Sequence, residues 1–357
     1  MKKKRIKESR AETAETMLRA IMRETGPEGR LPTISKLCSM LQISLGTLDR
    51  VLERLEREGL VLRQRGRGLF VTAAISRKTV ALVFGRGYAK GFPPFWLQLE
   101  SDCRKHVTAT GDRFRFYVDQ WSDSPETPSH SELDMALHAH EIDGLIVGAP
   151  NNIEQMVWLQ SQKLPLVALT NTGENPCRVT FNNDLLIQYA VETMVARKTR
   201  HAIILAPMGI ATAPLESLLL ERGIAFTAAE LDYTSDSTDP MRESPTIEEH
   251  GYRAMRNLLA RGLDADTVVS LDDMMTRGAL MAIAQAGLTI GKDLTVITHA
   301  NRNTSTLAPY DRNLILIEFD PEQFAVTAVD MLERLMMGRT PSRPIIRIDP
   351  KVLSGNR

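Results

Sequence analysis

Residues 31–71 read LPTISKLCSMLQISLGTLDRVLERLEREGLVLRQRGRGLFV, and this stretch decides the fold of the N-terminal part. Apolar residues recur every three or four positions in two segments, which follow the helix-capping residues Thr33 and Ser44. Gly59 ends the second segment, and the arginine- and glycine-rich residues 63–68 then separate two short apolar runs, as in a hairpin. Together with an amphipathic segment at 11–25, the pattern predicts three helices and a basic hairpin, which is a winged helix-turn-helix.

A winged helix-turn-helix presents the N-terminal half of one helix to the major groove of DNA. The outward residues of the predicted third helix are small or basic, so bases can approach and arginines can reach guanine edges or phosphates. A solvated helix surface is the alternative interpretation. The hairpin favours the DNA-binding interpretation, because arginines at its tip suit phosphates or a narrow minor groove. The candidate DNA-binding residues are Thr33, Ser35, Lys36, Ser44, Gly46, Thr47, Arg50, Arg54, Arg65, Gly66 and Arg67.

The net charge of zero over 357 residues conceals an asymmetry. Residues 1–78 hold 18 Lys and Arg against 9 Asp and Glu, while the remainder holds 26 against 35. A small basic part joined to a larger acidic one fits a polyanion-binding head on a body with other partners. The basic residues among the first seven fit a solvated tail equally well, but without them the segment still has a net charge of +4.

From residue 79 onward, short apolar strand candidates alternate with helical stretches. The alternation predicts an α/β fold with parallel sheets covered on both faces, and its repetition predicts two lobes. Ligands of such folds bind beyond the carboxyl ends of the strands. We therefore expect a winged helix-turn-helix at 1–74, a linker at 75–78 and a two-lobed domain at 79–357. The strand candidates are 80–84, 114–118, 145–147 and 166–169 in the first set, and 203–205, 225–226, 267–269 and 295–297 in the second.

The head resembles the DNA-binding domain of the GntR family, over 31–33, 43–44, 47–48, 55–61 and 65–71. The family often carries arginine where this chain has Leu45 and Asp49, and an acidic-basic pair where it has Ile34 and Ser35. The base contacts that those arginines make in the family cannot be assigned to this chain. We therefore expect a different operator sequence, and we expect DNA recognition to depend more on Thr47, Arg50 and the wing.

The body resembles the effector-binding core of the LacI family. The resemblance implies a two-lobed fold like that of periplasmic binding proteins, a dimer and a small-molecule effector, often a sugar, without chemistry. It further implies that 321–337 is a helix returning to the first lobe and that 345–348 is a late strand in the second. The motifs are FPPFW at 92–96, IDGLI at 142–146, VTFNND at 179–184, DMMTRGAL at 273–280, AGL at 286–288 and GKDLTVI at 291–297.

Two sugar anchors implied by the resemblance are missing. The acidic pair expected after the strand at 295–297 reads Ala300-Asn301, and the arginine expected within 209–220 is absent. The effector is therefore changed or lost. Phe95 and Trp96 are equally explained as core, and Asp273 as the cap of a helix that starts near Met274. The candidate effector-binding residues in matching places are Phe95, Trp96, Asn182, Asp272, Asp273, His299 and Asn301.

Other chemistry has little support in the sequence. Cys38, Cys103 and Cys177 are too far apart for a disulfide framework or a zinc cluster. On a helix His138 and His140 would point in roughly opposite directions, so we expect no metal site. No cofactor motif or catalytic triad is convincing. The basic N-terminus precedes no apolar stretch, and no run is long enough to cross a bilayer, so we expect a cytoplasmic protein with no membrane partner.

These patterns predict a homodimeric, non-enzymatic transcription regulator, and we prefer a repressor over an activator. It would bind a pseudopalindromic double-stranded DNA operator and respond to a small-molecule effector, a carbohydrate by resemblance. Two alternatives remain open. The sensor domain can serve only dimerisation in a ligand-independent regulator, or the chain can be a small-molecule binding protein or enzyme with an accessory head.

Overall fold

The computed structural model describes residues 10–85, 93–118, 131–149, 152–170, 174–207, 209–231, 246–262, 264–308 and 310–354. The chain divides into two compact units. The first unit is Met1–Arg86, Arg104–Leu166 and Leu332–Arg339, and the second is Gly87–Cys103, Val167–Met331 and Thr340–Arg357. Among the described helices, none combines the length and the hydropathy that a membrane span requires.

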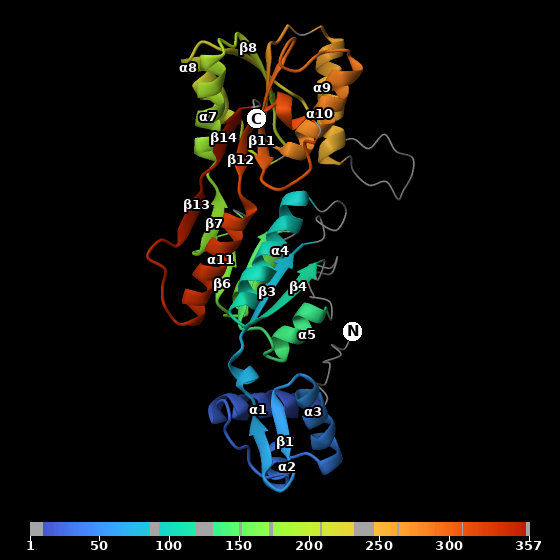
Figure 1. Cartoon of the computed structure of the whole chain (residues 1–357), viewed down its shortest axis with the longest axis vertical. Helices are drawn as coiled ribbons and strands as arrows, with labels where there is room; N and C mark the ends of the chain where they lie inside the picture. Colours follow the sequence, from blue (N-terminus) through green and yellow to red (C-terminus); the bar gives the residue numbers. More distant parts are fainter. Residues whose placement is uncertain are drawn as a thin grey trace, which may run out of the picture. The chain divides into compact units, whose positions relative to one another are not determined.

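The head, residues 10–76, is a winged helix-turn-helix, as predicted (Figure 1). Its helices pack around a core to which each contributes leucines, among them Leu18, Leu37 and Leu52. Thr33 and Ser44 cap two of the helices, because their side chains accept hydrogen bonds from the backbone N–H groups of Lys36 and Thr47. The elements are α1 (Arg10–Thr25), α2 (Ile34–Leu41), α3 (Leu45–Arg57), β1 (Val61–Gln64), β2 (Gly68–Val71) and η1 (Ala73–Ser76).

The wing is the antiparallel hairpin of β1 and β2, with a register that runs from Val61 opposite Val71 to Gln64 opposite Gly68. Gly66 lies in the turn with a φ of 76°, a left-handed conformation that favours glycine. The alternation of side chains buries Val61, Leu69 and Val71 against the helices. Residues 63–68 are thereby held away from the core.

The first sheet has six strands in the order β13-β7-β6-β5-β3-β4. All six residues of β3 are buried, as expected for a strand in the middle of a parallel sheet. The strands are β3 (Thr79–Phe84), β4 (Arg113–Val118), β5 (Gly144–Ala149), β6 (Leu166–Ala168), β7 (Arg178–Phe181) and β13 (Ile345–Ile348). Its accompanying helices are α4 (Pro94–Ala109), α5 (Glu132–His138), α6 (Ile153–Ser161) and α11 (Pro321–Met336).

The expectation that residues 345–348 join the second lobe is wrong. β13 pairs in parallel with β7, from Ile345 opposite Arg178 to Ile348 opposite Phe181, and so forms an edge of the first sheet. An apolar run of four residues predicts a strand but carries no information about its partner. Backbone bonds at both ends of the pairing, from Arg178 N to Pro344 O and from Asn182 N to Ile348 O, extend this edge.

The second sheet has the order β14-β12-β11-β10-β8-β9, and its pairings are parallel except for β14 against β12. Helices α7 (Asn183–Ala196) and α8 (Ala213–Glu221) lie on one side, and α9 (Ile247–Ala260) and α10 (Asp273–Gln285) lie on the other (Figure 1). The strands are β8 (His201–Leu205), β9 (Ala225–Ala228), β10 (Thr267–Ser270), β11 (Thr295–Asn301), β12 (Ile315–Phe319) and β14 (Lys351–Ser354), with the short helix η3 (Asp311–Asn313) before β12.

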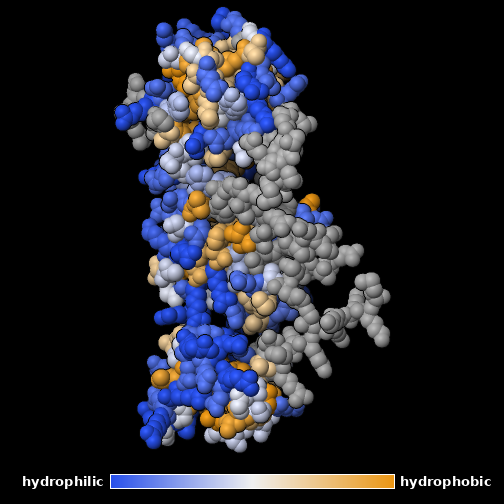
Figure 2. Space-filling model, turned by 90° about the vertical axis from the view of Figure 1, so that its right-hand side faces the viewer, coloured by the Kyte–Doolittle hydropathy of each residue, from blue (hydrophilic) through white to orange (hydrophobic). Residues whose placement is uncertain are grey.

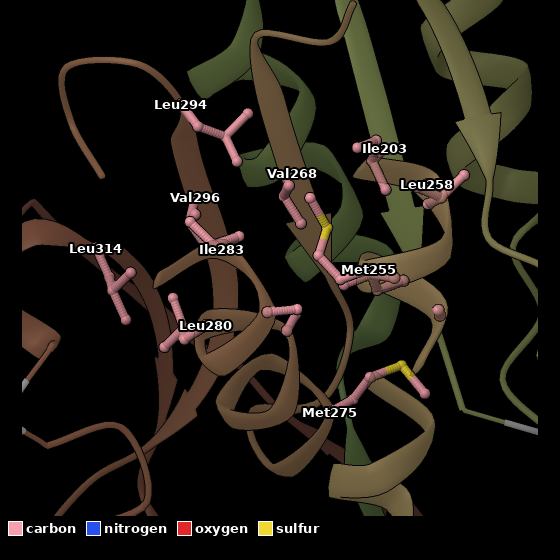
Figure 3. Packing of buried hydrophobic residues seen from close by; sticks show 14 of the residues in the cluster. Ile203, Met255, Leu258, Val268, Met275, Leu280, Ile283, Leu294, Val296 and Leu314 are labelled. Atoms are coloured by element: carbon pink, nitrogen blue, oxygen red, sulfur yellow. The ribbon is translucent and has the colours of Figure 1, made fainter. Parts of the chain in front are cut away.

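Helices α9 and α10 pack closely against each other. A Cβ atom on Gly278 would lie 1.8 Å from the carbonyl oxygen of Glu248, and one on Gly251 would lie 2.0 Å from that of Met275. The two helices therefore touch through their backbones. Figure 3 shows how the side chains beneath them, including Met255, Leu280 and Ile283, fill the space between these helices and the sheet.

Exposed apolar side chains are scattered over the surface. In Figure 2, outside the grey atoms, hydrophilic residues prevail and the apolar ones form separate patches. Isolated exposed apolar residues are normal for folded proteins and define no binding face by themselves.

Candidate DNA-binding surface and effector site

The eleven candidate DNA-binding residues occupy three neighbouring parts of the head. Three lie at the N-terminus of α2, five on α3 or its cap, and three in the turn of the wing. All are exposed except Thr47, which is half-buried. The surface of the head therefore presents the residue types that bases and phosphates require.

The first turn of α3 offers a small, open surface. Nothing lies within 4 Å of the position that a Cβ atom on Gly46 would take. The hydroxyls of Ser44 and Thr47 are 3.0 Å apart, and Arg50 Nε donates to the carbonyl oxygen of Gly46 at 3.3 Å. The arginine thus folds back along this turn, where a duplex could approach closely.

Two arginines near this surface are neutralised by carboxylates. Arg54 Nη1 lies 2.7 Å from Glu15 Oε2 in α1. Arg63 of β1 contacts Asp49 at 3.0 Å and Glu56 at 3.1 Å, both on α3. Asp49, at a position where the resemblance had suggested an arginine, therefore braces the wing against the helix. The sequence carried no signal for this contact, because it depends on how β1 packs against α3.

The head is joined to the rest of the first unit by a network of charges as well as by the chain itself. Arg19, which is buried in α1, donates to Glu15 at 2.9 Å and to Glu58 at 2.9 Å, and lies 3.7 Å from Glu141. Burial lowers the pKa of Arg19, but hydrogen bonds to Glu15 and Glu58 outweigh it, so the pKa is raised and the charge persists.

Further contacts surround this network. Arg113 Nη2 donates to the carbonyl oxygen of Glu58 at 3.1 Å, and Arg23 Nη2 donates to that of His140 at 3.0 Å. Arg115 lies 2.6 Å from Glu141. A polar cavity of about 60 Å³ lies among these side chains. Such a network restrains the orientation of the head relative to β3 and β4, because each rotation would separate several charged pairs.

Most candidate effector-binding residues meet at the carboxyl end of β11. Phe95 packs on Trp96 and on Phe181, with ring centroids 4.8 and 5.1 Å apart. Phe181 lies 5.7 Å from His299. Phe319 and Phe324, which the sequence analysis missed, complete the aromatic cluster against Phe181 at 4.9 and 4.6 Å. Phe319 could not be found because β12 had not been recognised as a strand.

A polar chain continues from the aromatic cluster. His299 Nε2 lies 3.1 Å from Asn301 Oδ1, and Asn301 Nδ2 donates to Asp273 Oδ2 at 3.0 Å. Asp272, not Asp273, caps α10, since its side chain accepts from Met275 N at 2.8 Å. The expected helix start near Met274 is one residue late. Burial and the charge of Asp273 raise the pKa of Asp272 to about 6.

Asn182 differs from the other candidates. It caps α7 and donates to Asp349 at 2.6 Å. Asp349 borders an open polar cavity of about 390 Å³, lined also by Arg302, Glu318 and Asp320. Asn182 is therefore held by a structural hydrogen bond beside β13.

Ala300, at the position of one sugar anchor implied by the resemblance, belongs to β11. Ala300 is buried at the end of β11 and offers no polar group. For metal, no cluster of three His, Cys, Asp or Glu side chains occurs in the part of the chain that the structure describes. His138 pairs with Asp134 at 3.2 Å, and His130 lies outside the described residues.

Comparison with protein families identifies both parts of the chain. Residues 10–71 match the family described as "Bacterial regulatory proteins, gntR family", and residues 191–355 match the "Periplasmic binding protein-like domain". The chain thus joins a GntR-type winged helix-turn-helix to a periplasmic-binding-protein-like domain, as the two resemblances implied.

Relatives and solved structures point the same way. The chain is 23% identical over 206 residues to the lactose operon repressor of Escherichia coli (strain K12). The match covers 57% of this chain and 55% of the repressor, so this chain spans about half the length of that relative. A LacI family transcriptional regulator from Arthrobacter sp. FB24 in complex with lactose has a TM-score of 0.59 at 20% identity, over 78% of this chain and 98% of that one.

A further structure with the same fold is the lac repressor dimer bound to operator and the anti-inducer ONPF. Its TM-score is 0.60 at 17% identity, over 78% of this chain and 93% of that one. At these identities the likeness establishes the fold of the body.

Proposed function

We propose that this chain is a transcription regulator that binds double-stranded DNA through its GntR-type head and a small molecule through its periplasmic-binding-protein-like body. The observation that carries the proposal is the exposed surface of α2, α3 and the wing, where the candidate DNA-binding residues gather. The domain division at 1–74, 75–78 and 79–357 belongs to the same proposal. Because a DNA-binding regulator acts on the chromosome, we place it in the cytoplasm, and we assign it no catalytic reaction.

We further infer a homodimer on a pseudopalindromic operator, acting as a repressor. A single head covers only a short half-site, and two linked heads gain affinity through their effective concentration. Supporting this, one solved structure with the same fold is a dimer bound to operator. Sedimentation of the full chain should give a dimer, and a reporter under the selected operator should be silenced.

The test of DNA binding is selection of duplexes from a random library by the full-length protein, followed by footprinting. We expect protection of a symmetric site. The variant with Arg65→Ala and Arg67→Ala should bind more weakly and show a flatter dependence of affinity on salt, because fewer phosphates are neutralised. Absence of any sequence-preferring binding would refute the regulator proposal, whereas an unchanged salt slope in the variant would refute only the role of the wing.

The effector is proposed to bind where His299, Asn301 and Asp273 adjoin the aromatic cluster. A thermal-shift screen of sugars, nucleosides and amino acids against the full chain tests this, since a ligand that binds the native state raises the melting temperature. A stabilising ligand whose effect is lost in Asn301→Ala supports the proposal.

A second candidate, a sensor that serves only dimerisation, is favoured by two observations. Ala300 occupies the position of a sugar anchor, and Phe95, Phe181 and Phe324 pack on one another. This candidate predicts no stabilising ligand in the same screen, and a clear shift by any compound would exclude it.

A further inference from the structure

Arg30 lies beside the wing, although in the sequence it precedes the whole helix-turn-helix. The loop between α1 and α2 runs antiparallel to β2, with backbone hydrogen bonds from Glu28 N to Val71 O at 2.8 Å and from Leu31 N to Leu69 O at 2.9 Å. Arg30 is paired with Phe70 in this arrangement. The loop therefore extends the wing sheet beyond β2.

The side chain of Arg30 reaches toward the tip of the wing. Arg30 and Phe70 are paired, and Gly68 precedes Phe70 by two residues, so all three share one face of the sheet. A Cβ atom on Gly68 would lie 3.2 Å from Arg30 Nε and 3.4 Å from Arg30 Nη2. The guanidinium thus rests on the bare backbone of Gly68, next to the turn that carries Arg65 and Arg67.

Among the described residues, no carboxylate is paired with Arg30. Arg63 projects from the other face of the hairpin and is neutralised by Asp49 and Glu56. Arg30 is exposed and forms no ion pair with any residue that the structure describes. A guanidinium that is held in place without a carboxylate partner is suited to a phosphate, which it can bind through two parallel hydrogen bonds.

We propose that Arg30 contacts a phosphate of double-stranded DNA when the wing enters a groove. The inference rests on the proposed function and assigns a DNA contact outside the helix-turn-helix and the hairpin. A wing inserted into a groove has a phosphate strand on each side. Arg30 contacts the DNA strand that lies along the face of the wing turned away from α3. Because the Arg30 side chain already packs on Gly68, it loses less conformational freedom on binding.

The experiment measures affinity of the full-length protein for a labelled mixed-sequence duplex as a function of salt concentration. Arg30→Ala should lower the magnitude of the slope of log affinity against log salt by about 1, as expected for one phosphate contact. Arg30→Lys keeps the charge and should retain the wild-type slope. Arg222→Ala, an exposed arginine after α8 in the second unit, is the matched control for net charge and should leave the slope unchanged.

Hydrogen exchange of α1 and α3 reports whether each variant keeps its folded head. If Arg30→Ala loses this protection, Arg30→Gln, which retains most of the packing on Gly68, replaces it. A wild-type slope in a folded charge-removing variant overturns the assignment of Arg30, even when the wild type selects a symmetric operator. Failure of the wild-type protein to prefer any sequence is a different result, and it refutes the proposed function itself.

Discussion

Replacing Gly46 by alanine separates the stability of the head from its fit to DNA. Gly46 is the second residue of α3, its φ is not positive, and a Cβ atom there would meet nothing within 4 Å. The fold therefore accepts alanine without strain. Alanine is favoured over glycine by up to about 1 kcal/mol inside a helix, and we expect about 0.5 kcal/mol in this first turn.

The same methyl group would stand on the surface where bases approach. If α3 enters the major groove through its first turn, Gly46→Ala should weaken binding to the selected operator about tenfold, equivalent to about 1.4 kcal/mol. Fluorescence anisotropy measures the affinity, and hydrogen exchange of the α3 amides in the full chain measures the stability.

The matched control is Ser39→Ala on α2. Ser39 is exposed and is not a candidate DNA contact, and its replacement should stabilise the helix by about 0.5 kcal/mol without altering affinity. Wild-type affinity in Gly46→Ala would show that the first turn of α3 does not approach DNA. A loss of protection in Gly46→Ala would instead contradict the helix geometry on which the reasoning depends.

Three further changes test the framework that carries the two sites. Arg19→Met should reduce the stability of α1 against hydrogen exchange by about 3 kcal/mol, because the buried Glu15 loses one of its two arginine partners and Glu58 loses its pairing with Arg19. Arg23→Met at an exposed pair should cost about 1 kcal/mol or less, and equal losses would contradict the role of burial. The raised pKa of Asp272 means that the native state binds its proton more tightly than the unfolded chain, so stability falls as the pH rises through about 6. Asp272→Asn keeps the helix cap without the charge, and should melt higher than wild type at neutral pH with a flatter pH profile; a lower melting temperature there would refute this. Gly278→Ala would place a methyl group 1.8 Å from the Glu248 carbonyl oxygen, and should lower stability by about 1–3 kcal/mol; an unchanged denaturation midpoint would contradict the close helix contact.

Local features were determined by the sequence. Thr33 and Ser44 cap their helices where the pattern predicted, and the wing turns at Gly66, because capping, helical periodicity and turn conformation depend on residues only a few positions apart. The alternation of apolar strands with helices likewise predicted two parallel sheets, since that order favours βαβ units. The limit of such patterns is visible at α10, where Asp272 rather than Asp273 reaches the free backbone N–H of Met275.

Only the tertiary structure decided which distant residues meet. It placed β13 beside β7, set Asp49 against Arg63, and surrounded Arg19 with glutamates from three segments. It also brought Phe319 and Phe324 against Phe181 in the candidate effector site, and laid Arg30 on Gly68 at the wing. A periodic pattern states which face of an element is buried, but not what lies across from it. Partners are set by the packing of whole elements, and the ion pairs of Arg19 and Arg63 are of that kind.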